Sequence, residues 1–215
     1  MGSKKDESAA TATLKTSDFV HLHNHTHHSL LDGLTKIHDL VDKVKEYGME
    51  ATAVTDHGTM SGVLEFYKAA VDGEIKPILG IEAYVAARSR HDRDASKDKA
   101  RYHLTLLAMN DQGYRNIMKL STLANLEGMY YKPRMDHEIL ELYSEGVIVL
   151  SGCASGEVGE NLRAGNYEEA KRIAAWYQSV FGDRYYLEVQ DHGHAGAPFT
   201  WDVQAKINEG LFKIS

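Results

Sequence analysis

The chain has 215 residues, 43% of them hydrophobic and 26% charged, which is ordinary for a globular protein and allows one sizeable core, as in a (β/α) barrel or a doubly wound sheet. Its formal net charge of −7 excludes a uniformly basic surface of the kind that binds nucleic acid by counterion release. Bound divalent cations could still make the local electrostatic potential positive where a phosphate binds. The single cysteine, Cys153, excludes an internal disulfide framework, and no stretch of about 20 apolar residues offers a membrane helix, so we expect a cytoplasmic protein without a membrane partner.

Apolar periodicity and turn residues predict alternating strands and helices after a polar start. Residues 1–17 are small and polar, and we expect a disordered tail that is partly a cloning remnant. The predicted strands lie around residues 20–25, 51–56, 77–85, 102–109, 147–151 and 185–190. The predicted helices span residues 35–48, 61–71, 113–126, 137–143, 167–181 and 200–215. Because helices would link successive strands, the pattern predicts a parallel sheet.

The first predicted strand belongs to a histidine-rich stretch, residues 19–33, that reads FVHLHNHTHHSLLDG. In an extended strand alternate side chains share a face, so His21, His23 and His25 would line one face. Neutral imidazole is a common ligand of divalent transition metals, and Asp32 offers a carboxylate just beyond. The interleaved apolar residues distinguish the stretch from a purification tag, but pairs of the form H-x-H also occur by chance. The stretch alone therefore leaves metal binding open.

Polar residues recur at the ends of the predicted strands, where parallel α/β proteins place their chemistry. His25, His57, Cys153 and His192 all fall at or just after a strand end. Glu82 lies inside an otherwise apolar strand, where a carboxylate is costly to bury unless it is paired or bound to a cation. Their shared location predicts a multinuclear metal site assembled from the whole chain.

The motifs HLHNHT with SLLDG, TDHG, LGIEAY, YHL and LSGC resemble those of the polymerase and histidinol phosphatase (PHP) family. The segments FVHLHNHT, AVTDHG, EFYK, IKPILGIEAY and YYKPR are most similar, in order and spacing, to the PHP domains at the N-terminus of bacterial replicative DNA polymerases. The resemblance covers residues 18–215 and implies a distorted (β/α) barrel of seven strands with two or three divalent ions for phosphoester hydrolysis. We expect the chain to stop before the family's last motif, D-x-H, which would leave a strand edge exposed and favour association.

The resemblance also implies a ligand set, in which Glu82 bridges two metals and Cys153 stands where other members use histidine. The implied ligands are His23, His25, Asp32, His57, Glu82, His103 and Cys153. Of these, Glu82, His57 and Asp32 are the implied catalytic residues, and the donor set suits zinc, manganese or iron, with the thiolate favouring zinc over magnesium. His21 departs from the aspartate that many members carry there and is interpreted as a group that supports the ligands from behind. Four further histidines and one acid are interpreted as lying outside the ligand set, at the surface or on a different strand: His27, His28, Asp191, His192 and His194.

The implied activity is a 3'-5' proofreading exonuclease that acts on the 3' end of DNA within a replicative polymerase, with the other polymerase domains and replisome subunits as partners. Lys132 and Arg134 could contact phosphate or be solvated loop cations. Residues 86–101 mix charges of both signs and are interpreted as a solvated surface insertion. Two alternatives remain open: a free-standing phosphoesterase of small phosphorylated metabolites, and a non-catalytic scaffold of the polymerase.

Overall fold

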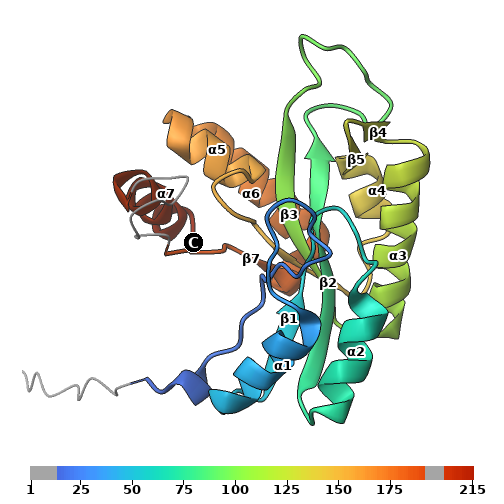
Figure 1. Ribbon diagram of the computed structural model, residues 1–215. Coiled ribbons are helices and arrows are strands. Elements are labelled where there is room, and N and C mark those ends of the chain that lie inside the picture. Colours follow the sequence, from blue (N-terminus) through green and yellow to red (C-terminus); the bar gives the residue numbers. More distant parts are fainter. Residues whose placement is uncertain (1–13, 192–200) are drawn as a thin grey trace, which may run out of the picture.

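The computed structural model describes residues 14–191 and 201–215, which form a mixed sheet surrounded by helices (Figure 1). The strands are β1 (Ala51–Val54), β2 (Lys76–Ala86), β3 (Arg101–Ala108), β4 (Met129–Tyr130), β5 (Lys132–Met135), β6 (Val147–Leu150) and β7 (Tyr185–Tyr186). The α-helices are α1 (Ile37–Glu46), α2 (Val63–Asp72), α3 (Asp111–Leu126), α4 (His137–Leu142), α5 (Glu157–Ala164), α6 (Tyr167–Phe181) and α7 (Trp201–Ile214). In the view of Figure 1, α3 and α4 lie to the right of the long strands β2 and β3, and α5 and α7 lie to their left.

The sheet is mixed, so the prediction of a wholly parallel sheet is wrong. Its strand order is β4-β5-β2-β3-β6-β7, with β1 also paired to β2. The pairs β1/β2, β2/β5 and β6/β7 are parallel, whereas β2/β3, β3/β6 and β4/β5 are antiparallel. The physical reason lies in the connection after β2, which is a loop rather than a helix, and antiparallel neighbours need no crossover helix.

Most predicted elements are present, and α6 and β2 begin and end within one residue of the prediction. Sequence reasoning missed α5, a short helix with only two large apolar residues on its buried side, Val158 and Leu162. It also made β7 too long, because the chain leaves regular pairing after Tyr186. Among the described helices, none is both long and apolar enough to cross a bilayer.

The histidine-rich segment runs beside β1 without forming a regular strand. The amide of Ala53 donates to the carbonyl of His21 (2.8 Å), and the amide of Thr55 donates to that of Asn24 (2.9 Å). These bonds are three residues apart on the segment but two apart on β1, so the segment carries one extra residue, as in a bulge. The strict alternation that would put three histidines on one face is therefore broken.

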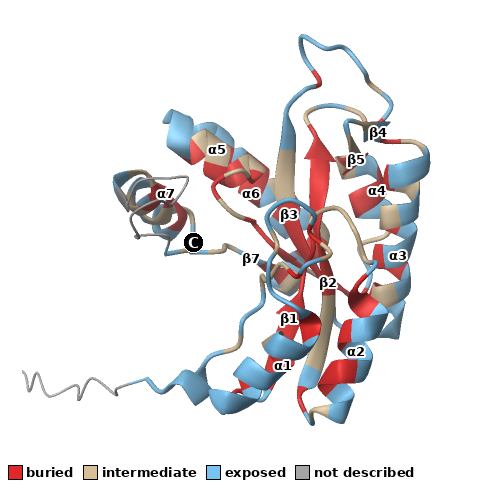
Figure 2. Ribbon diagram, in the orientation of Figure 1, coloured by how far each residue is buried: buried red, intermediate tan, exposed pale blue. Residues whose placement is uncertain are grey.

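The main core lies between β2, β3 and β6 on one side and α3, α5 and α6 on the other. Figure 2 shows much of β2 and the middle of β3 as buried, while large parts of the helices are exposed. Leu106 and Val149 from the sheet and Ile117 from α3 are fully buried in this core, each contributing roughly 1.5–3 kcal/mol relative to an exposed side chain. A second cluster joins α1, α2 and β1 around Ile37 and Phe66. Both cores support the sheet beneath the histidine-rich segment.

The segment between β2 and β3 is not simply a solvated insertion, so that interpretation is wrong for two of its charged residues. Arg90 is only 8% exposed and its Nη1 lies 3.1 Å from both carboxylate oxygens of Asp136. Asp98 is 1% exposed and accepts two hydrogen bonds from the guanidinium of Arg88. Buried charges are tolerated here because each has a charged partner with good geometry.

Candidate metal centre

Glu82 is the centre of a cluster of imidazoles. Its carboxylate is 1% exposed, with Oε1 lying 3.2 Å from Nε2 of His23 and 3.0 Å from Nδ1 of His103, while Oε2 contacts Nδ1 of His57. Two groups of candidate ligands, each with its atoms within 4.8 Å of one another, share this residue: His23, His25 and Glu82, and His57, Glu82 and His103. A carboxylate common to both groups has the position that a bridging ligand needs.

The register between β2 and β3 places two of the ligands on one face. Glu82 lies opposite Thr105, and Tyr84 lies opposite His103. A residue and the diagonal neighbour two positions along the adjacent strand share a face at roughly 7–8 Å between backbones, within reach of long side chains. The antiparallel pairing that the sequence did not predict therefore brings His103 to Glu82.

A glycine turn directs His57 toward Glu82. The amide of Glu82 donates to the carbonyl of Asp56 (3.2 Å), and the amide of Gly58 donates to the carbonyl of Glu82 (2.8 Å). Gly58 has φ +64°, and a Cβ there would lie 2.8 Å from the ring of Tyr84. Only glycine takes this conformation without strain or collision, so the TDHG motif is a structural requirement of this turn.

Asp56 anchors the loop of residues 26–33 over the centre. Its carboxylate is 1% exposed and accepts hydrogen bonds from the amide of Thr26 (2.6 Å), the hydroxyl of Thr26 (2.9 Å) and the hydroxyl of Ser29 (2.7 Å). The amide of His57 in turn donates to Ser29 Oγ (3.1 Å). Asp56 therefore positions the loop and the histidine turn together, a role that sequence reasoning did not assign to it.

Asp32 and Cys153 lie at the rim of the two groups. Between the groups, the His25 ring stacks on that of His57, with centroids 3.9 Å apart. Asp32 Oδ2 lies 3.0 Å from Nε2 of His57, on the exposed side of the site. Cys153 Sγ lies 3.5 Å from Nδ1 of His103. The seven implied ligands thus converge, although Asp32 and Cys153 each contact a member of the groups without belonging to either.

Sequence reasoning missed Glu188. Its Oε1 lies 2.6 Å from Nδ1 of His23, and its Oε2 accepts a hydrogen bond from Thr105 Oγ1 (3.4 Å). The amide of Glu188 donates to Ser151 Oγ (2.8 Å), which holds this segment beside β6. The available signal was a carboxylate in the apolar run YLEV, the same signal that had marked Glu82.

Among the described residues, His21 and Asp191 take no part in the two groups. His21 is exposed, and its ring contacts Phe19 at 4.9 Å between centroids rather than Glu82. Asp191 is exposed and belongs to neither group. His192 and His194 lie outside the described residues.

The Glu82 carboxylate and the neighbouring histidines shift one another's pKa values. Burial alone would raise the pKa of Glu82, but hydrogen bonds with His103 and His23 hold it well below its usual range. Burial opposes protonation of His23, yet its contacts with Glu188 and Glu82 raise its pKa to about 10. His103 is likewise opposed by burial, and the contacts with Cys153 and Glu82 raise its pKa to about 10. Protons on these histidines and bound cations would therefore compete for the same nitrogen atoms.

The pKa values of His25 and His57 shift in opposite directions although their rings stack. The hydrogen bond with Glu82 raises the pKa of His57. Burial lowers the pKa of His25 to about 4. His25 is therefore neutral at physiological pH and presents a free lone pair, which a metal ligand requires.

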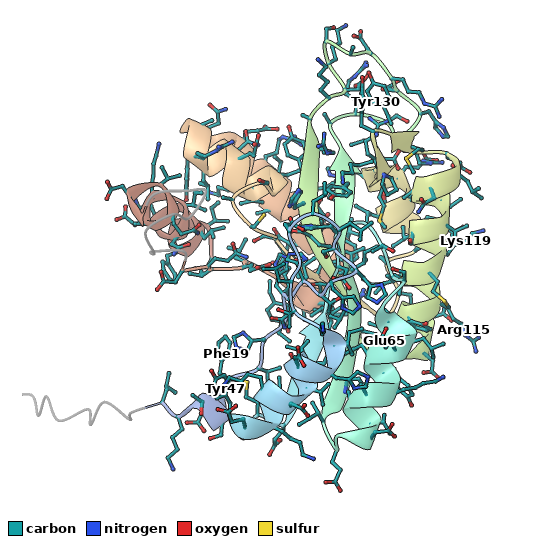
Figure 3. The ribbon with its side chains drawn as sticks, viewed as in Figure 1. Phe19, Tyr47, Glu65, Arg115, Lys119 and Tyr130 are labelled. Carbon is teal, nitrogen blue, oxygen red and sulfur yellow. The ribbon has the colours of Figure 1, made fainter. Side chains whose placement is uncertain are left out.

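Arg134 is buried, so its interpretation as a solvated loop cation is wrong, and its guanidinium is bonded within the protein. It is 1% exposed, and its guanidinium lies 5.1 Å from the ring centroid of Tyr130, which Figure 3 labels. Its nitrogen atoms donate to four backbone carbonyls, those of Gly128, Arg90, Asp92 and Asp98. Arg134 therefore ties the insertion between β2 and β3 to the loop before β5.

Lys132 remains near the centre. Its Nζ lies 5.6 Å from the ring centroid of Tyr84, whose ring is 5.3 Å from that of His103. The guanidinium of Arg101 lies 6.0 Å from the same tyrosine ring. Two cations thus flank the aromatic ring that borders the metal centre.

The donor set fits divalent transition metals. It combines imidazole nitrogens, carboxylate oxygens and one thiol, which suit zinc, manganese or iron, whereas magnesium and calcium prefer oxygen alone. In the described part of the chain, Glu82 makes its ion pairs with histidines and not with any lysine or arginine. A buried carboxylate whose charged partners are all potential metal ligands is consistent with cations bound between them.

Comparisons with known proteins agree with this geometry. The PHP domain profile matches residues 21–192. DNA polymerase III subunit alpha of Borreliella burgdorferi is 47% identical over 200 residues, which cover 93% of this chain and 17% of that protein. The Treponema pallidum subunit is 50% identical over 177 residues, covering 81% of the chain and 15% of that protein. The chain thus spans only a small part of these relatives.

A solved structure supports the fold. An amidohydrolase from Chromobacterium violaceum superimposes with a TM-score of 0.54 at 14% identity, over 90% of this chain and 83% of that one. At this identity the likeness concerns the fold alone, and it agrees with a mixed α/β domain of the barrel type. Because the family profile covers most of the sequence and the ligand positions converge around Glu82, the chain belongs to the PHP domain family.

Proposed function

We propose that this domain is a metal-dependent phosphodiesterase that removes nucleotides from the 3' end of DNA, as a 3'-5' proofreading exonuclease of a DNA polymerase III alpha subunit. The observation that carries the proposal is the position of Glu82 between two groups of ligands. Two ions a few ångströms apart are the usual arrangement for displacement at phosphorus. The relatives named DNA polymerase III subunit alpha supply the substrate class.

The domain's own residues would have distinct roles in this reaction. Divalent ions held here would activate a water molecule and offset the charge that develops on the phosphate. Glu82 would hold two ions together. His57 contacts Glu82 through Nδ1 and Asp32 through Nε2, so its ring is fixed from both sides. Asp32 is 62% exposed in its side chain, and this exposure supports entry of the substrate on its side of the site.

Lys132 and Arg101 would contact the phosphates of the DNA strand. The two cations lie on either side of the Tyr84 ring, next to His103. Each phosphate carries one negative charge, and cations beside the centre would offset the repulsion from a chain with net charge −7. This arrangement favours a nucleic acid strand over a small metabolite.

Zinc, manganese and iron are the proposed ions, two at least and three if the rim ligands Asp32 and Cys153 complete a further site. The proposed partners are DNA, the remaining domains of the polymerase and other replisome subunits, in the cytoplasm. A free-standing metabolite phosphatase is disfavoured by the similarity to polymerase subunits. A non-catalytic scaffold is the alternative that experiment must exclude.

The experiment measures metal content and hydrolysis together. The protein is reconstituted with zinc, manganese or iron, its ions are counted by elemental analysis, and a single-stranded DNA labelled at its 5' end is used to follow shortening from the 3' end. We expect at least two ions and progressive shortening, both lost in Glu82→Ala and retained in Glu141→Ala, an exposed glutamate on α4. Metal binding without hydrolysis would support the scaffold, and p-nitrophenyl phosphate hydrolysis without DNA shortening would support the phosphatase.

A further inference from the structure

A second cluster of metal-ligating side chains lies outside the Glu82 centre, where the histidine-rich loop meets α2. It consists of His27, His28 and Glu65, each of which offers one ligand atom, and these atoms lie within 4.8 Å of one another. We call it the outer His/Glu cluster. It shares no residue with the two groups around Glu82. Figure 3 shows Glu65 near the end of α2 that approaches the loop.

The distances in this cluster match a tetrahedral ion. Nε2 of His28 lies 3.4 Å from Oε2 of Glu65. An ion with bonds of about 2.0–2.1 Å separates neighbouring tetrahedral ligands by about 3.4 Å. The rings of His27 and His28 are 4.5 Å apart between centroids, tilted by 44°, and one nitrogen of the exposed His27 lies within 4.8 Å of the ligand atoms of His28 and Glu65.

His28 is held in the orientation that a ligand requires. Its Nδ1 lies 3.2 Å from Ser61 Oγ, which leaves Nε2 to face Glu65. Ligating histidines generally donate their second ring N–H to an oxygen, which fixes the tautomer and the plane of the ring. The ring also packs against Gly62, where a Cβ would lie only 2.7 Å from Cδ2 of His28. Two independent contacts therefore fix this imidazole before any ion binds.

The backbone of the loop fixes the histidine pair relative to α2. The amide of His28 donates to Thr26 Oγ1 (3.2 Å), and Thr26 is bonded to the buried Asp56. The amide of His27 donates to the carbonyl of Thr35 (2.9 Å). The cluster is nevertheless open to solvent, because the side chains of His28 and Glu65 are 25% and 45% exposed. Ions can therefore enter without any movement of the core.

We propose that the outer His/Glu cluster binds one divalent transition-metal ion of the zinc class and so joins the loop to α2. Two imidazoles and one carboxylate are the ligand set of many zinc sites, and a water molecule completes the tetrahedron. Magnesium and calcium are excluded as preferred ions because two of the three ligands are nitrogen atoms. The site needs neither the Glu82 centre nor the proposed hydrolysis.

The test counts the ions bound by a variant in which Glu82→Ala has removed the central carboxylate of the Glu82 centre. Metal-free Glu82→Ala protein is titrated with Zn²⁺ by calorimetry and with Co²⁺ by visible absorption, alone and combined with His28→Ala or Glu65→Gln. His38→Ala, an exposed histidine on α1, is the matched control. We expect one ion with a tetrahedral cobalt spectrum in Glu82→Ala and in its His38→Ala combination, and loss of that ion with His28→Ala or Glu65→Gln.

The same titration on the chain with Glu82 intact guards against misfolding of the Glu82→Ala background. There, His28→Ala and Glu65→Gln should each bind one ion fewer than both the unmodified protein and His38→Ala, while DNA hydrolysis is not part of the readout. Equal numbers of ions in all four proteins would overturn the proposal. A cobalt spectrum that is the same in Glu82→Ala and in the combination of Glu82→Ala with His28→Ala would also overturn the proposal.

Discussion

Glu188 holds one nitrogen of the His23 ring while Glu82 holds the other. Oε1 of Glu188 lies 2.6 Å from Nδ1, and Oε1 of Glu82 lies 3.2 Å from Nε2. Such an arrangement fixes both the tautomer and the plane of the imidazole. Glu188 is therefore a positioning residue for the ligand that begins the first group.

We expect Glu188→Gln to weaken metal binding rather than to remove it. Loss of an outer carboxylate partner typically lowers metal affinity about 10- to 100-fold. Competition with a chromogenic zinc chelator measures this affinity directly. Glu141→Ala is the matched control. Unchanged affinity in Glu188→Gln would mean that Glu82 and the sheet alone orient His23.

Asp56 is expected to contribute stability through the loop that it anchors. Replacing it with alanine removes the acceptor of three hydrogen bonds and leaves buried donors without a partner. We expect the free energy of unfolding to fall by about 3 kcal/mol, the size of one or two hydrogen bonds to a charged group. Urea unfolding measures this change. Asp39→Ala, an exposed aspartate on α1, should unfold like the unmodified protein.

The metal-free protein should lose stability as the pH rises from about 6.5 to about 10. The pKa values of His23 and His103 are raised to about 10 in the folded protein, whereas unfolded histidine titrates near 6.5. The folded state therefore binds more protons across this window. The stability that these two histidines contribute is fully present below about pH 6.5 and declines as the pH rises above it.

Thermal unfolding in excess chelator, measured at several pH values, tests this dependence. In Glu82→Gln the neutral side chain no longer stabilises the imidazolium groups, so the decline should become shallower. A metal-loaded protein should show the opposite trend, because ions compete with protons for the same nitrogen atoms. Equal slopes in the unmodified and Glu82→Gln proteins would contradict the coupling.

Lys132 and Arg134, two residues apart, should respond to substitution in opposite ways. Lys132→Ala should raise KM for DNA and reduce the dependence of binding on salt, with little change in stability, because one phosphate contact is lost. Arg134→Ala should lower the free energy of unfolding by about 3 kcal/mol or more, because four buried carbonyls lose their donor. Parallel assays of DNA shortening and urea unfolding on both variants separate the two roles.

The resemblance to the PHP family implied ligand positions that lie close together in the structure, whereas the sequence did not predict the sheet that presents them. His23, His57 and Glu82 could be identified as candidates because the resemblance depends on local motifs, and a carboxylate in an apolar run is also a local signal. The antiparallel pairing of β2 with β3 could not, since the intervening loop reads like any polar insertion and its anchor at Arg134 depends on contacts between distant segments. Strand pairing is decided by the whole chain, so local periodicity does not determine it.

Glu188 and Arg134 show the same limit of sequence analysis. Glu188 is not singled out from the sequence, although a carboxylate in the apolar run YLEV is the same kind of signal as Glu82. For Arg134 the sequence left open a phosphate contact and a solvated loop cation, because arginine is mostly exposed. Its burial became evident only from the backbone carbonyls that surround it.

The register of β2 against β3 makes the centre independent of the segment that joins these strands. Glu82, Thr105 and His103 keep their positions through backbone pairing over seven residue pairs, from Gly80 with Leu107 to Ala86 with Arg101. Pairing of β2 with β3, and not the loop that joins the two strands, keeps these residues close together. A protein cut between Ser96 and Lys97 should therefore remain assembled with the candidate ligands in place, and a peptide tag or a fluorescent reporter inserted there should leave metal binding unchanged.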